Sequence, residues 1–312
     1  MAAKNNDVLI IFSRHVYESG QAPYIHHADI LNDAQGNDKK VNFYYGVLSE
    51  LIFVYDGVEL TVTEPRSGRK LSSFGLVFFQ KWMYLPHFAL AAADYLQHEN
   101  TDFMSHEVAN QPVRSKLVEM VKYVYADLPY AKTVVAPSDQ LVEFAQKGTL
   151  PFAFPFIVKD ILGTQGQSNY LVQNVDELTD ALRQSPDRHF MAQEFIPNDC
   201  DYRIVVMGGT PRYVMRRTRD AEAGGHLNNT SQGSDAEFIA LDELPAHVME
   251  EAVAAARAVN RGEYGGVDIL IDPQGKHWVL EVNASPEIQT GFNAPYKSKI
   301  LVDYIAERLS QN

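Results

Sequence analysis

The sequence predicts a mixed α/β protein with about three domains. Short strand-like runs fill the first hundred residues, and an Ala-rich helical stretch, HFALAAADYLQHEN, follows them. Further along, segments with helical spacing and strand-like segments take turns up to a hairpin near the C-terminus. Strands interleaved with helices are typical of α/β and α+β domains. At 312 residues the chain is long enough for two or three of them.

The expected domain boundaries lie where the pattern changes. Residues 1–110 hold the runs DVLIIF, VNFYYG and FGLVFFQKW, with a hairpin turn at Asp56–Gly57. Residues 111–195 begin with the amphipathic helix of QPVRSKLVEMVKYVYADL, followed by TVVAP, a helix with Ser138 as N-cap, and the strand FPFIVKD. Residues 196–312 form the third domain, which includes the strands GGVDILID and HWVLEVN.

Composition excludes several classes of protein. A formal net charge of −13 argues against a broad basic surface for nucleic acid or anionic membrane, so any anionic ligand must be held by a local cluster of cations. The single cysteine, Cys200, excludes an intramolecular disulfide and a Cys metal cluster. The first apolar run is cut by Ser13 and Arg14 and is too short to span a membrane. We therefore expect a cytoplasmic protein with no nucleic-acid or membrane partner.

The hairpin near the C-terminus carries three oxygen-bearing side chains. Asp268 lies in GGVDILID, and Glu281 and Asn283 lie two residues apart in HWVLEVN, hence on one face of that strand. The link DPQG has turn chemistry, so the two strands are expected to pair and the three side chains to face one another. Carboxylate and amide oxygens suit Mg²⁺, so the sequence predicts a magnesium site here.

A lysine and a glycine-containing loop in FPFIVKDILGTQGQSNYLV can bind phosphate. Lys159 lies near the end of an apolar strand, where its ammonium supplies a point charge. Glycines let backbone N–H groups approach phosphate oxygens. The alternative is a hairpin turn with a lysine that reaches out to solvent. The loop residues of interest are Gly163, Gln165 and Gly166.

The strand MAQEFIPND combines backbone hydrogen-bonding groups with apolar side chains, which is what an adenine needs. The alternative is an ordinary edge strand. The candidate residues are Gln193, Glu194, Phe195 and Ile196.

Arginines in the next two strands can stabilise charge on a transferring phosphoryl group. Asp201 and Arg203 lie two apart on one strand face, and MRRTR supplies Arg217. The alternative is a surface ion-pair ladder. Asn229, in the loop NNTSQG, can bind substrate or phosphate, or can simply form a turn.

The order of these pieces resembles the ATP-grasp superfamily over roughly residues 75–295: a helix lysine (Lys116), a strand lysine before a glycine loop, QEFI, DYR, an arginine pair, N…QG, and D…EVN. GGVDIL followed by VLEVNASP is most similar to the RimK-like carboxylate–amine ligases, the group that contains ribosomal-protein glutamate ligases and relatives of glutathione synthetase. The resemblance implies an ATP-grasp fold with an N-terminal pre-ATP-grasp α/β domain, a small central domain and a C-terminal antiparallel-sheet domain. It also implies an activity in which ATP converts a carboxylate into an acyl phosphate that an amine attacks.

The resemblance implies a role for each candidate residue. The ligands of Mg²⁺, or of Mn²⁺ in its place, would be Asp268, Glu281 and Asn283. The residues that contact ATP would be Lys116, Lys159, Gly163, Gln165, Gly166, Gln193, Glu194, Phe195, Ile196 and Asp201. The residues at the reacting groups would be Arg203, Arg217 and Asn229. The partners would be ATP, a carboxylate substrate and an amine substrate such as an amino acid, peptide or protein terminus, and self-association into a homo-oligomer is left open.

The chain departs from the family pattern at two positions. Leu227 stands where an arginine is usual before the loop asparagine, and Glu287 follows NASP where glycine is common. Glu287 could repel an acidic substrate or bind an amine. Near the N-terminus, His26 and His27 are adjacent and expected on a strand, as surface residues or as metal ligands. The alternative to a ligase is a degenerate ATP-grasp protein that binds nucleotide as a sensor or scaffold.

Overall fold

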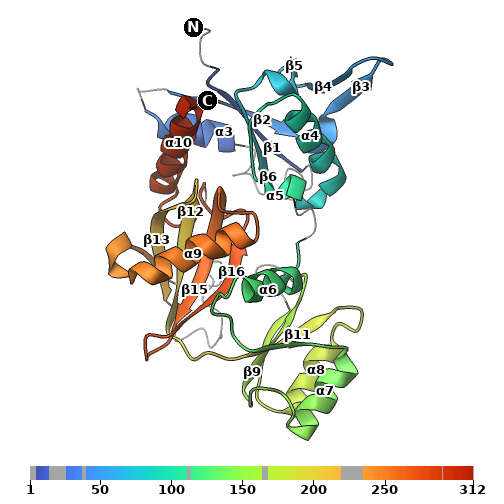
Figure 1. Cartoon of the computed structure of the whole chain (residues 1–312), viewed down its shortest axis with the longest axis vertical. Coiled ribbons are helices and arrows are strands. Elements are labelled where there is room, and N and C mark those ends of the chain that lie inside the picture. The colour runs from blue at the N-terminus through green and yellow to red at the C-terminus, as the bar shows by residue number, and fades with distance from the viewer. Residues whose placement is uncertain are drawn as a thin grey trace.

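The described residues form a mixed α/β architecture with four β-sheets, which agrees with the predicted fold class (Figure 1). A computed structural model describes residues 5–13, 26–36, 40–110, 114–163, 168–218, 235–289 and 291–311. Within these ranges, no helix is long and apolar enough to cross a lipid bilayer.

The N-terminal unit is built around a parallel sheet with the strand order β2-β1-β6-β7. The strands are β1 Asp7–Phe12, β2 Asn42–Val47, β6 Leu76–Gln80 and β7 Phe103–Met104. The helices are α3 His27–Ala34, α4 Pro86–His98 and α5 Glu107–Asn110, with 3₁₀ turns at Leu48–Glu50, Leu71–Ser73 and Trp82–Tyr84.

Helices cover both faces of this sheet. Leu9 and Ile11 of β1 share a core with α4, whereas Val8 and Ile10 share a core with α3 and with α10 (Ala294–Gln311). Successive side chains of a strand point to opposite faces, which is why a doubly covered parallel strand such as DVLIIF is a continuous apolar run.

The C-terminal helix packs across the expected domain boundary. Figure 1 shows α10 beside α3 of the N-terminal unit. Arg308 of α10 donates from Nε and Nη2 to the Asp102 carboxylate, both at 2.6 Å, and forms an ion pair with Glu263. α10 therefore packs against the N-terminal unit and also shares a core with Val205 and Met207 of the C-terminal sheet.

A small three-stranded sheet projects from the N-terminal unit (Figure 1). Its strands are β3 Ile52–Tyr55, β4 Leu60–Glu64 and β5 Arg69–Lys70. The predicted turn between β3 and β4 is confirmed: Asp56 Oδ1 accepts hydrogen bonds from the backbone N–H groups of Val58 and Glu59, both at 2.9 Å. Gly57 has φ +97°, a conformation that glycine adopts without strain.

The central unit is an antiparallel sheet with α7 and α8 packed on one face. Its strand order is β10-β9-β11-β8, so β11 is interior and the expectation of an edge strand is wrong. Helix α7 begins at Ser138 with Pro137 as N-cap, so the predicted Ser138 cap is also wrong. The bounds are β8 Thr133–Val135, α7 Ser138–Lys147, β9 Phe156–Asp160, β10 Asn169–Val172, α8 Val175–Arg183 and β11 Phe190–Glu194.

The C-terminal unit is a five-stranded sheet in the order β14-β13-β12-β15-β16, with every pair antiparallel. Helix α9 covers one face, and α6 packs there too through Tyr123, although α6 was expected in the central domain. The bounds are α6 Lys116–Tyr125, β12 Cys200–Met207, β13 Thr210–Thr218, β14 Asp235–Ile239, a 3₁₀ turn Leu241–Glu243, α9 Ala246–Ala258, β15 Tyr264–Ile271 and β16 His277–Asn283.

The histidine pair lies at a helix start, which corrects the expected strand. His27 is the first residue of α3, and His26 is its N-cap. His27 is buried, and its Nδ1 lies 2.8 Å from Gln80 Oε1. Burial lowers the pKa of His27 to about 4, so the ring is neutral near pH 7. A buried neutral imidazole on a glutamine is a structural contact.

Candidate active site

One face of the C-terminal sheet changes from apolar to charged along its strands. Ile204 and Val206 of β12 point into the α9 core, whereas Val205 and Met207 point to the opposite face. By strand alternation Arg203 lies on that opposite face, nearer the strand start. The charged end of this face is therefore next to an apolar core that contains Val205 and Met207.

The predicted pairing of the two C-terminal strands is confirmed. Asp268 lies opposite Glu281, and Gly266 lies opposite Asn283, with a register shift next to Asp268. The Asn283 amide donates from Nδ2 to Asp268 Oδ2 at 3.2 Å and to Glu281 Oε1 at 3.3 Å. The three side chains thus converge on one point, as the hairpin argument required.

This donor set fits a hard divalent cation. In the described part of the chain, no three His, Cys, Asp or Glu side chains are grouped to hold a metal. A cation held by Asp268 and Glu281 would take the amide oxygen of Asn283 as a further protein ligand. The Asn283 N–H groups lie within hydrogen-bonding distance of both carboxylates. The residues present therefore fit Mg²⁺ or Mn²⁺.

Two arginines hold Asp268 in place. Arg203 donates from Nε and Nη2 to the two carboxylate oxygens, both at 2.7 Å, and Arg217 Nη2 lies 3.0 Å from Oδ2. Burial alone would raise the pKa of Asp268, but the two guanidinium groups outweigh it and hold the pKa below the usual range. The same carboxylate raises the pKa of Arg203 against its own burial. Asp268 is therefore a fixed anion.

The arginine ladder is buried, so its interpretation as a surface ladder is wrong. Arg217 is 2 % exposed, and its Nε donates to Asp201 Oδ1 at 2.6 Å. Burial raises the pKa of Asp201 to about 6 despite this partner. Asp201 thus orients the guanidinium group of Arg217. Its expected contact with ATP stays a prediction.

Lys159 is buried, with 9 % of its surface exposed, so the alternative of a lysine that reaches out to solvent is wrong. Phe156 and Val158 of β9 pack on α7 and α8, so by alternation Lys159 lies on the opposite face of the central sheet. Its Nζ donates to Gln193 Oε1 at 2.8 Å, and Gln193 Nε2 donates to Thr133 Oγ1 at 2.8 Å. Burial lowers the pKa of Lys159 to about 8, and the field of Glu281 partly opposes this.

Lys116 lies close to Lys159, as the phosphate hypothesis requires. Its ammonium donates to the backbone carbonyl of Gly163, and its backbone N–H donates to Ile161 O at 2.8 Å. The charge of Lys116 further lowers the pKa of Lys159. Two like charges held together in a partly buried place favour an anion between them.

An apolar cluster lies between the central and C-terminal sheets. It joins Ala131, Ile196, Leu270 and Trp278, with Leu280 packed against it. Ile196 therefore lies where the apolar side of an adenine could rest. The side chain of Gln193, by contrast, is used on Lys159. Glu194 and Phe195 are half-buried beside this cluster in sequence, and the backbone N–H of Glu194 donates to Lys132 O at 2.9 Å.

Several expected residues lie outside the described part of the chain. Gln165 and Gly166 of the glycine loop, and Asn229 with the departure at Leu227, are among them. Their roles stay predictions.

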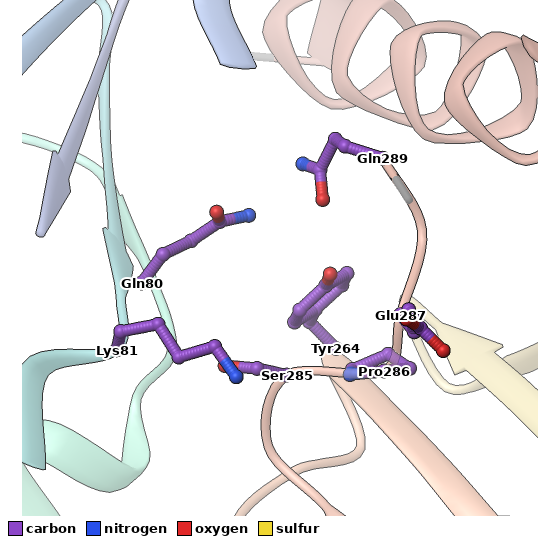
Figure 2. Close-up of a pocket in the computed structure, with 7 residues that line it drawn as sticks. All are labelled: Gln80, Lys81, Tyr264, Ser285, Pro286, Glu287 and Gln289. Atoms are coloured by element: carbon purple, nitrogen blue, oxygen red, sulfur yellow. The ribbon is translucent and has the colours of Figure 1, made fainter. Parts of the chain in front are cut away.

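A small polar cavity lies between the end of β6 and the turn after β16. Figure 2 shows the amides of Gln80 and Gln289 directed into it, whereas the Glu287 side chain is turned away. Gln289 is 7 % exposed, and its Nε2 has no hydrogen-bond partner among the described residues. Lys81, with φ +48°, also lines the cavity. The cavity volume of ≈ 10 Å³ leaves room for about one water molecule.

The cavity adjoins the charged face through a close backbone contact. A Cβ built on Gly266 would lie 2.8 Å from Pro286 Cβ and 3.5 Å from Arg203 Cδ. Glycine therefore lets the turn carrying Pro286 pack directly on β15 beside Arg203. A larger cavity of ≈ 450 Å³ lies in the central unit, lined by Phe152, Phe154 and other uncharged residues, away from these groups.

Sequence reasoning missed a buried charged cluster next to the site. Arg261 contacts Glu107, Glu119 and the backbone of Val282. Gln289 and Lys81 were missed as well. These residues belong to no motif, and the two glutamates lie 154 and 142 residues from Arg261, so no local pattern signals the contact.

Comparisons with known proteins agree with the fold. The RimK-like ATP-grasp domain family matches residues 116–305. The alpha-aminoadipate–LysW ligase LysX of Sulfurisphaera tokodaii is 26% identical over 168 residues, which cover 50% of this chain and 54% of that protein. The propionyl-CoA carboxylase alpha chain of Sus scrofa is 26% identical over 174 residues, 52% of this chain and 23% of that protein, so the chain spans about a quarter of that relative's length.

Solved structures share the fold over nearly the whole chain. The ATP-grasp ligase PsnB, complexed with a precursor variant, Mg and ADP, superposes with a TM-score of 0.63 at 14% identity and covers 96% of this chain and 99% of its own. The D-alanine–D-alanine ligase from Bacillus anthracis, complexed with ATP, gives 0.67 at 16% identity, with 98% and 97% covered. Because the family match covers more than half of the sequence, the chain belongs to the RimK-like ATP-grasp family.

Proposed function

We propose that the protein is an ATP-dependent carboxylate–amine ligase that forms an amide bond and releases ADP and phosphate. The observation that carries the proposal is the placement of two carboxylates and an amide, backed by two arginines, close to the buried Lys159 and the half-buried Lys116. A divalent cation and a nucleoside triphosphate need opposite charges at adjacent places, and this site offers both.

The lysine side would hold the phosphates of ATP. Lys159 is fixed by Gln193, and Lys116 by Gly163, so neither ammonium has to be ordered when the nucleotide binds. Ile196 and its apolar neighbours would cover the adenine, with the backbone of Glu194 and Phe195 beside it. Gln165 and Gly166 complete the proposed phosphate loop.

The sheet side would stabilise the charge that moves during the reaction. Asp268, Glu281 and Asn283 would hold Mg²⁺ or Mn²⁺, which neutralises phosphate charge when bound. Arg203 and Arg217 are fixed in advance and cost little reorganisation when charge develops next to them. Asn229 stays a proposed contact to substrate.

The bonds made and broken balance without an enzyme nucleophile. An oxygen of the carboxylate attacks the γ-phosphorus of ATP, and the bond to the bridging oxygen breaks, so ADP leaves. The amine nitrogen then attacks the carbonyl carbon of the acyl phosphate, the C–O bond to phosphate breaks, and the amine loses a proton. Cys200 lies half-buried on β12, and no step requires it.

The substrates proposed are an acid and an amine of which at least one is an amino acid, peptide or protein terminus. The names of the relatives support this range: one is an alpha-aminoadipate–LysW ligase, and one structure is a D-alanine–D-alanine ligase. The Gln80–Gln289 cavity lies beside Arg203, where the carboxylate must meet ATP, so we place the acid substrate on that side.

Trapping the activated acid tests the proposal. The protein is incubated with ATP, Mg²⁺, hydroxylamine and a panel of amino acids and short peptides, and hydroxamate and ADP are measured. One or more acids should yield both products, and ¹⁸O in the carboxylate of that acid should appear in phosphate when its amine is supplied. AMP and pyrophosphate would show adenylation instead. Nucleotide binding with no turnover across the panel would favour a sensor or scaffold.

A further inference from the structure

Arg261, in the loop between α9 and β15, brings together three distant parts of the chain. It is 2 % exposed. Its Nε donates to Glu107, and its Nη1 donates to Glu119 Oε1 at 2.6 Å and to the backbone carbonyl of Val282. Glu107 lies in the N-terminal unit, and Glu119 lies in α6.

Each glutamate is oriented by a second partner. Trp82 Nε1 donates to Glu107 Oε1 at 3.2 Å, and the Tyr123 hydroxyl donates to Glu119 Oε2 at 3.3 Å. Both carboxylates thus use one oxygen on Arg261 and the other on an aromatic donor. Glu107 and Glu119 thus fix the guanidinium group that donates to the Val282 carbonyl.

Val282 lies between two of the proposed metal ligands. Its neighbours in β16 are Glu281 and Asn283. Among the described strands β16 is the last in the sheet order, and on its outer side the Val279 N–H donates to Pro129 O at 2.8 Å. Consecutive Cα atoms are about 3.8 Å apart, so a shift of the Val282 backbone moves both neighbours. Arg261 supplies the contact that a neighbouring strand would otherwise provide.

The charges of the cluster balance only with a second arginine. Arg114 has no hydrogen bond or ion pair within the described ranges, yet it lies in the field of Glu107 and Glu119. Burial lowers its pKa, and the two carboxylates oppose that effect. Two arginines and two glutamates are neutral together. Apolar residues of similar volume often replace such clusters without loss of stability, so stability alone does not account for it.

We propose that Arg261 is a positioning residue for the metal site: it holds the Val282 carbonyl so that the ligands on either side of it face the cation. Through Glu107, this alignment depends on the docking of the N-terminal unit. That unit also supplies Lys81, the sequence neighbour of Trp82, to the polar cavity. Contacts from Trp82 to Glu107, and from Arg261 to Glu107 and Val282, therefore connect the wall of the polar cavity to β16. The inference rests on the proposed function for the existence of the cation site.

Manganese binding to the full-length protein with ADP tests this without any amide being formed. Free Mn²⁺ is measured by electron paramagnetic resonance for the parent, Arg261→Met and Glu107→Gln. Loss of an outer contact to a metal ligand weakens metal affinity by about 10- to 100-fold, and we expect a rise of that size in the Mn²⁺ dissociation constant. Glu107→Gln keeps the side-chain volume, so it tests the same contact if Arg261→Met does not fold.

Arg308→Met is the matched control. Arg308 also joins the N-terminal unit to the rest of the chain through two half-buried carboxylates, Asp102 and Glu263. Within the described ranges, none of its hydrogen-bond or ion-pair partners lies in β16. Its Mn²⁺ affinity should stay within about twofold of the parent, since a change of that size is a few tenths of a kcal/mol. The melting temperature of each variant shows whether its substitution destabilises the whole protein.

Parental Mn²⁺ affinity in a folded Arg261→Met or Glu107→Gln protein would overturn the inference, as would an equal loss in Arg308→Met. A parent that binds no Mn²⁺ with ADP would remove the metal site and both proposals with it. A parent that binds Mn²⁺ but forms no hydroxamate would contradict the ligase proposal alone, because the titration still decides the role of Arg261.

Discussion

The two sides of the site hold their charges in different ways. On the C-terminal sheet, Arg203 and Arg217 are already bound to Asp268, so cations and anions are paired before any ligand arrives. On the central sheet, Lys159 is buried against the neutral amide of Gln193, and its pKa falls to about 8. The two arginines are therefore already ion-paired, whereas the burial cost of the Lys159 ammonium is opposed only in part, by the fields of Glu281 and Glu119.

This difference predicts that the two sides affect different steps, nucleotide binding and turnover. A buried ammonium with a neutral partner gains most from an anion that is present in the ground state, such as a resting phosphate. Guanidinium groups that are already paired gain less from that ground-state anion, but they are fixed in place for charge that appears during reaction. Lys159 should therefore govern nucleotide affinity, and Arg203 should govern turnover.

The largest effect is expected where the carboxylate pair is broken. Glu281→Gln removes one negative charge from the metal ligands and should lower turnover by about 100-fold or more, because a catalytic cation supplies several kcal/mol of charge stabilisation. Turnover is measured over a magnesium titration, with a melting temperature matched to the parent. Near-parental rates at ordinary magnesium would remove Glu281 from the metal site.

A paired substitution sharpens the comparison itself. Arg203→Ala should lower kcat by on the order of 10²–10³ with a small change in ATP affinity, as for other fixed donors to developing charge. Lys159→Ala should lose about 1.5–3 kcal/mol of ATP binding, the usual worth of a charge-assisted contact. Calorimetric ATP binding and steady-state rates are measured on both. The prediction fails if the Arg203 variant loses affinity but keeps its kcat.

The smallest effect expected is a shift along the pH axis. Lys159 binds phosphate when protonated, and burial lowers its pKa to about 8, so kcat/KM for ATP should fall above that pH in the free enzyme. Lys159→Arg stays charged and should move the falling limb to higher pH. Lys297, whose pKa burial also lowers to about 8, provides the matched control as Lys297→Arg. If the falling limb of the pH profile moved only in Lys297→Arg, the titrating group would be Lys297.

Strand alternation explains why much of the site was predictable. The convergence of Asp268 with Glu281 and Asn283 needs only a two-residue period and a hairpin turn, both of which are local properties of the sequence. The same period places Lys159 opposite the apolar residues of its strand. Neighbouring residues fix these features, so composition and spacing reveal them.

Strand order and long-range packing were not predictable in the same way. Nothing local shows that β11 is interior or that Asp201 and Arg217 are buried, because both depend on which strands lie on either side. The contact of Arg261 with Glu107 joins positions 154 residues apart. The position of α10 against α3 likewise depends on the closed tertiary fold.

The position of α10 also sets an order for folding during synthesis. β1 precedes α10 in the sequence, yet one of its faces shares a core with Leu301 and Ile305 of that helix. Chains emerge from the ribosome N-terminus first, so this face stays partly uncovered until α10 has been made. An apolar strand made early is thus completed by a helix made late, and chaperones can reach its open face in the meantime.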